Sequence, residues 1–164
     1  MKRILLFALV LLSLLPMGSC NRGAGKLSFD GIERVRLQGL TSVEVVAHIT
    51  NDTGHKLALD GAEVAVFYQG RRIATVLLLE GLKMDAKSSG SLSSQWQIRV
   101  SDPISAYLVL RKINANDPSQ IDISCSVAGQ RGSRALKFSR VQMPLSDFLR
   151  IFGLSISSVS KYLE

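Results

Sequence analysis

Apolar residues recur at every second position over much of this chain, and that period restricts the fold more than any other feature. Residues 43–50 alternate as VEVVAHIT, and residues 92–100 alternate as LSSQWQIRV. Successive side chains of a strand point to opposite faces of the sheet, so alternation indicates strands with one buried face. The sequence therefore predicts a fold built from β-strands.

Further strand-like segments are separated by residues that favour turns. The expected strands are 57–59, 64–68, 71–80, 121–127 and 135–143. Asn, Asp, Gln and Gly mark the expected turns at 51–54, 60–61, 69–70 and 129–132, and residues 83–90 are expected to form a polar loop. The segment 71–80 is apolar on both faces, which predicts a central strand.

Two short helices are expected. Pro103 suits a first helical turn, Ser101 or Asp102 can cap it, and the apolar spacing predicts a helix over 103–113. A second amphipathic helix is expected to start near Ser146, within a C-terminal stretch of 145–164. That stretch either caps one end of the domain, docks a partner or lies on a bilayer.

Six to seven strands with one or two short helices predict an all-β fold, an antiparallel sandwich over residues 27–144. The alternative is an open sheet with helices on one side, which needs more helix than the sequence offers.

The N-terminus has a different character from the rest of the chain. Lys2 and Arg3 precede an apolar run at 4–15 that is interrupted by Ser13 alone. Twelve residues are too few to span a bilayer, which takes about 20. A positive head, an apolar run and small residues after it are typical of a secretory signal peptide, here residues 1–19.

The segment Leu15-Pro16-Met17-Gly18-Ser19-Cys20 resembles the lipobox of bacterial lipoproteins. The resemblance implies that the Cys20 thiol receives a diacylglyceryl group and becomes the acylated N-terminus. The alternative is ordinary secretion, with Cys20 free or paired with Cys125. Residues 20–26 are a short polar tether, which would keep the domain within about 20 Å of the membrane. No acidic run follows Cys20, which favours a periplasm-facing position.

A second resemblance rests on the order of three segments. Residues 41–51, 64–75 and 91–100 are similar to the valine-alternating strand, the hairpin and the strand after a serine-rich loop in late-embryogenesis-abundant group 2 domains, also called water-stress and hypersensitive-response domains. Asp52 stands where that family usually has Pro after Asn. The resemblance implies an immunoglobulin/fibronectin-III-like sandwich with a non-enzymatic binding or stress-protective role.

The sequence offers little for catalysis or ligand binding. His48 and His55 are the two histidines, and no Cys, His or carboxylate cluster has metal-ligand spacing. No nucleophile elbow, phosphate loop or zinc-protease motif occurs. We therefore expect no catalytic residue, no metal and no cofactor. Cys125 alternates with apolar residues and is expected to be a small buried side chain.

The chain carries a net charge of +7, of which Lys2 and Arg3 belong to the leader. Arg71, Arg72, Arg131 and Arg134 flank expected turns, as solvated hairpin ends or as contacts with anionic lipid or another envelope component. Nucleic acid is not an expected partner, because an exported chain does not meet the cytoplasmic pool.

The sequence thus predicts a lipid-anchored protein of the bacterial cell envelope with a non-enzymatic interaction domain. A stress-protective role and a carrier of a small apolar ligand are the alternatives. A membrane, through Cys20, and an envelope protein are the expected partners.

Overall fold

Eight strands and two short helices are formed by the residues described in this computed structural model, which are 27–39, 41–151 and 155–157. The strands are β1 (Leu27–Gln38), β2 (Ser42–Asn51), β3 (Leu57–Tyr68), β4 (Arg71–Leu78), β5 (Leu82–Met84), β6 (Ser88–Val100), β7 (Ile121–Arg131) and β8 (Arg134–Pro144). The helices are α2 (Pro103–Asn114) and α3 (Leu145–Ile151).

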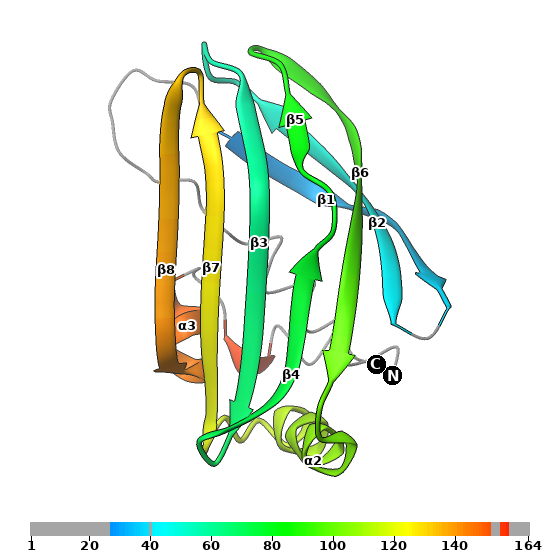
Figure 1. Cartoon of the computed structure of the whole chain (residues 1–164), viewed down its shortest axis with the longest axis vertical. Coiled ribbons are helices and arrows are strands. Elements are labelled where there is room, and N and C mark those ends of the chain that lie inside the picture. The colour runs from blue at the N-terminus through cyan, green and yellow to red at the C-terminus, as the bar shows by residue number, and fades with distance from the viewer. Residues whose placement is uncertain (1–26, 40, 152–154, 158–164) are drawn as a thin grey trace.

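All described strand pairs are antiparallel and belong to one sheet, in the order β1-β2-β6-β4-β3-β7-β8, with β5 paired to β3. The sheet curls, and β1 and β2 run at an angle to β3, β7 and β8 (Figure 1). The predicted antiparallel all-β class is confirmed. The described strands number eight, more than the six to seven expected.

β3 passes without a break through Asp60 and Gly61, where the sequence predicted a turn. β7 pairs with β3 along its whole length. The register of this pairing shifts between Leu59 and Gly61, so that Asp60 is accommodated without a turn. Gly129 lies opposite this shift, and a Cβ there would overlap the carbonyl oxygen of Ala58. Gly129 therefore permits close packing of two strands.

Two other expected boundaries are also wrong. The turn predicted at 129–132 lies later, between Arg131 and Arg134, with Gly132 at φ +59°. Residues 83–90 are not a loop throughout, because β5 pairs with β3 and β6 already begins at Ser88. β2 supplies a backbone partner for every residue from Ser88 to Gln97, and backbone pairing needs no apolar side chains.

Several local predictions are confirmed. β4 is a central strand, paired with β3 and β6. Gln69 and Gly70, at φ 51° and 75°, form the tight connection before it. Pro103 begins α2, and the Asp102 carboxylate caps it by accepting a hydrogen bond from the Ser105 amide at 3.0 Å.

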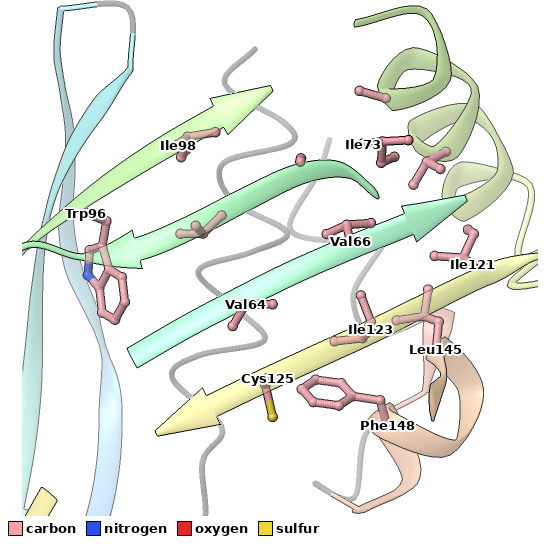
Figure 2. Packing of buried hydrophobic residues seen from close by; sticks show 14 of the residues in the cluster. Val64, Val66, Ile73, Trp96, Ile98, Ile121, Ile123, Cys125, Leu145 and Phe148 are labelled. Carbon is pink, nitrogen blue, oxygen red and sulfur yellow. The ribbon is translucent and has the colours of Figure 1, made fainter. Parts of the chain in front are cut away.

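The hydrophobic core lies on the inner face of the curled sheet. Side chains of β2, β3, β4, β6 and β7 meet those of α2 and α3 in one cluster. Figure 2 shows Phe148 of α3 beside Cys125 and Ile123 of β7. The largest fully buried side chains of this core cluster are Phe148, Ile73, Ile113, Ile121, Ile123, Leu145, Leu149, Val43 and Val64.

α3 begins directly after Pro144 and buries Leu145, Phe148 and Leu149 against the sheet. Ile156 also packs against the core. This is the arrangement expected if the C-terminal stretch caps the domain.

The predicted leader, Cys20 and the tether at 20–26 lie outside the described residues. Of the helices that are described, neither has the length and apolar character needed to cross a membrane.

Candidate functional site

Helix α2 carries apolar side chains on two opposite sides. Ala106, Val109 and Ile113 face the core and are buried. Ile104, Tyr107 and Leu108 face outward, with 77%, 61% and 40% of their surface exposed. The spacing of these three places them on one face across consecutive helical turns. We call this group the α2 surface.

Among the side chains that the structure describes, the α2 surface is the main cluster of exposed apolar residues. Six large hydrophobic side chains in this set are exposed, and three of them form the α2 surface. The other three, Val35, Leu79 and Val141, are far apart in the sheet order. Scattered single residues of this kind are normal on any protein, whereas a contiguous group points to a contact.

Basic residues lie at both ends of α2. Arg111 is in its last turn and is exposed. Arg71 and Arg72 begin β4, which is held against the start of α2: Ser101 Oγ donates to the Arg72 carbonyl at 3.1 Å, and the Asp102 amide donates to the Ile73 carbonyl at 3.2 Å. Part of the Arg72 charge is engaged, because its guanidinium stacks on Phe67 and lies 3.9 Å from Glu63.

Two carboxylates at the ends of α2, those of Asp102 and Asp117, have hydrogen-bond partners within the protein. Hydrogen bonds from the Ser105 amide and then the Ser105 hydroxyl lower the pKa of Asp102, with a smaller contribution from Arg71. The pKa of Asp117 is lowered to about 2, chiefly by the hydrogen bond from Lys112 Nζ at 2.6 Å. Asp102 and Asp117 therefore stay ionised and, with Glu63 beside Arg72, offset most of the positive charge of Arg71, Arg72, Arg111 and Lys112, which leaves these groups with one positive charge in excess.

His48 joins a second group of polar side chains on the outer face of β1, β2 and β6. Its Nδ1 lies 3.2 Å from Glu33 Oε1, and its Nε2 lies 3.1 Å from Ser89 Oγ. Ser91 Oγ donates to the same Glu33 oxygen at 2.6 Å. The sequence predicted His48 on a strand face, but its partners are 15 and 41 residues away and no local pattern identified them.

The order hydroxyl, imidazole, carboxylate is also that of a hydrolase triad. Here Ser89 Oγ forms a second hydrogen bond, with Thr50 Oγ1 at 2.8 Å. Thr50 Oγ1 in turn donates to Asp30 Oδ2 at 2.8 Å. The His48 and Glu33 side chains are 41% and 44% exposed, so water surrounds the group. The geometry is that of cross-strand pairs that hold the edge strand β1 on the sheet.

His55 lies in the turn after β2 and is exposed. Among the described residues, no three His, Cys, Asp or Glu side chains are grouped so that they could hold a metal ion.

Asn51, at the start of the turn predicted over 51–54, joins two loops at the other end of the sheet from α2. Its Oδ1 accepts hydrogen bonds from the Thr53 amide and hydroxyl at 3.1 and 2.6 Å. Its Nδ2 donates to the carbonyls of His55 and Asp85 at 2.9 and 2.7 Å. The role is structural, and it extends beyond the local turn to the segment between β5 and β6.

Cys125 is 3% exposed, and burial raises the pKa of its thiol. This burial matches the prediction of a structural side chain, because a reactive cysteine needs a lowered pKa.

The two arginine pairs singled out in the sequence lie apart. Arg131 and Arg134 face each other across the β7–β8 hairpin, and Arg131 is level with Leu57 at the start of β3. Arg71 pairs with Tyr68 at the opposite end of β3. The fold therefore brings only Arg71 and Arg72 close to the α2 surface.

Comparison with known proteins assigns the chain to no family. No known protein family and no curated protein sequence matches this chain. Among solved structures, it is similar to a protein from Archaeoglobus fulgidus at 13% identity, covering 72% of this chain and 99% of that one with a TM-score of 0.42. It is also similar to a yeast GGA1 GAE domain at 14% identity, covering 77% and 96% with a TM-score of 0.35. These likenesses are too distant to transfer a function.

Proposed function

We propose that this chain is a lipoprotein of the bacterial cell envelope, anchored by acylated Cys20 and facing the periplasm. Its β domain acts as a non-enzymatic interaction module. The observation that carries the proposed activity is the α2 surface, a contiguous exposed apolar group with basic residues at both ends. An exposed group of this kind favours contact with another surface over catalysis.

The position of α2 supports a role in contacts beyond the anchor point. Leu27, the first residue after the proposed tether, pairs with Asn51, and Asn51 pairs with Ser88 at the start of β6. α2 follows the end of β6 at Val100, and it lies at one end of the sheet while β5 lies toward the other (Figure 1). The 13 residues of β6 separate the two ends by about 40 Å.

The proposal extends to the finer fold. We interpret the curled sheet as the two layers of an immunoglobulin/fibronectin-III-like sandwich, as the resemblance to late-embryogenesis-abundant group 2 domains implies. In support, Val43 and Val45 of β2 belong to the same buried cluster as Val64 and Val66 of β3. Both strands therefore turn side chains toward the same core, as the facing layers of a sandwich do.

Metabolic labelling with palmitate tests the anchor. We expect the wild-type protein to incorporate labelled acyl chains and to fractionate with membranes. The Cys20→Ala variant should lose the label, because the thiol is the acceptor. Cys125→Ala is the matched control, since it removes the chain's other cysteine, which is buried. Equal labelling of wild type and Cys20→Ala would contradict the anchor.

A further inference from the structure

We infer that the α2 surface docks on the face of a bilayer that contains anionic lipid. Ile104, Tyr107 and Leu108 would enter the boundary between headgroups and acyl chains, while Arg71 and Arg111 would contact the headgroups. The inference builds on the proposed anchor, which supplies the membrane, and adds a second point of contact.

The side chains of α2 suit an interfacial site. Ile104 and Leu108 are aliphatic, and Tyr107 places a polar hydroxyl on an apolar ring, which fits the headgroup level of a membrane. Binding of an amphipathic helix to an interface scales with its exposed apolar area and with its attraction to anionic lipid. α2 offers both, because its outward side is apolar and its ends are basic.

The charges favour an anionic surface in particular. Arg71 and Arg111 lie at opposite ends of α2. The carboxylates close by are bound within the protein, Asp102 by Ser105 and Asp117 by Lys112. Asp102 remains ionised and offsets part of the charge of Arg71, whereas Arg111 forms no ion pair among the described residues and is free to attract lipid phosphates.

The area of the α2 surface favours lipid over a protein partner or a second copy of this chain. A stable protein interface buries about 800 Å² on each side. Three side chains on one 12-residue helix offer much less. A small contact is enough for a bilayer when the chain is already tethered to it, because the tether makes the second contact intramolecular.

The inference also fixes an orientation. The tether reaches about 20 Å, whereas β6 separates the Leu27 end from α2 by about 40 Å. Both points can touch one bilayer only if the long axis of the sheet is strongly inclined toward the membrane plane. The domain would then lie along the membrane and not stand upright on it.

Site-specific fluorescence on the whole lipidated chain tests this contact. An environment-sensitive probe is attached at Ile104→Cys or, as matched control, at Val141→Cys; both native side chains are 77% exposed. Each protein is reconstituted into vesicles of phosphatidylglycerol and phosphatidylcholine, or of phosphatidylcholine alone. We expect a blue shift and several-fold weaker quenching by aqueous iodide at position 104 in the anionic vesicles, and neither at position 141.

Charge variants test the electrostatic part. Arg71→Gln with Arg111→Gln should abolish most of the protection at position 104, whereas Arg131→Gln with Arg134→Gln, at the other end of β3, should leave it intact. The fluorescence of buried Trp96 reports that each variant is folded.

Equal quenching at positions 104 and 141 in anionic vesicles would overturn the inference. So would equal protection in both kinds of vesicle. A probe that is aqueous in vesicles but protected in membranes of the producing cells would assign the α2 surface to a protein partner and also overturn it. Failure of the anchor looks different: Cys20 would take up the probe, and the protein would not float with the vesicles.

Discussion

At the scale of single residues, Asn51 has the most demanding environment. It is completely buried, and each of its two side-chain polar atoms has partners in the protein. Asn51 joins the loop after β2 to the segment between β5 and β6. It is the only buried side-chain amide among the residues whose burial is described. Removing its donors would leave two carbonyls, those of His55 and Asp85, without these hydrogen bonds.

We expect Asn51→Asp to lower the free energy of unfolding by about 3 kcal/mol or more. The change keeps the shape of the side chain but replaces two donors with an oxygen that faces two carbonyls. Urea denaturation measures the loss. Asn116→Asp, the same change at an exposed position, should have little effect. Equal unfolding midpoints for the two variants would contradict a structural role for the Asn51 amide.

At the scale of elements, the C-terminal end of α2 is stabilised by hydrogen bonds from the turn that follows it. The amides of Ala115, Asn116 and Asp117 donate back to carbonyls in the last turn of the helix. Lys112 Nζ then bonds Asp117 Oδ2, and this hydrogen bond is the main reason that the pKa of Asp117 falls from its ordinary value of 3.8 to about 2.

A lowered pKa in the folded state means that the Asp117 carboxylate stabilises the fold above about pH 4, and that this contribution is lost as the pH falls toward 2. In an NMR titration we expect Lys112→Met to raise the pKa of Asp117 toward 3.8. Lys137→Met, which changes an exposed lysine of β8, should not move it. An unchanged pKa in Lys112→Met would show that other groups hold the carboxylate ionised.

At the scale of the whole molecule, α3 packs against the core that the sheet forms. Phe148 is 1% exposed and packs on the same cluster as Trp96, although Trp96 lies on β6 and α3 contacts β7 and β8. A single continuous cluster predicts that the sheet and α3 unfold together.

We expect Phe148→Ala to destabilise the protein by about 3–5 kcal/mol. Trp96 is the chain's single tryptophan, so its fluorescence follows the sheet while circular dichroism follows the whole molecule. Both transitions should move to lower denaturant together. Arg150→Ala, on the exposed side of α3, should shift them little. A Trp96 transition that stayed in place would show that α3 docks on a sheet that is stable without it.

The sequence alone determined much of the local structure. Alternation predicted β2 and most of β6, Asp102 and Pro103 predicted the start of α2, and Gln69-Gly70 predicted the hairpin after β3. These features depend on neighbouring residues: which side chains share a face, which residue caps a helix, and which residues accept positive φ.

Only the tertiary structure decided how these elements are combined. Strand order, the continuity of β3 through Gly61, and the meeting of His48 with Glu33 and Ser89 all depend on partners distant in sequence. The spacing of Ile104, Tyr107 and Leu108 predicted a helix, but it did not show that this side would face outward. Periodicity reports which residues share a side, and packing against the rest of the molecule selects the side that is buried.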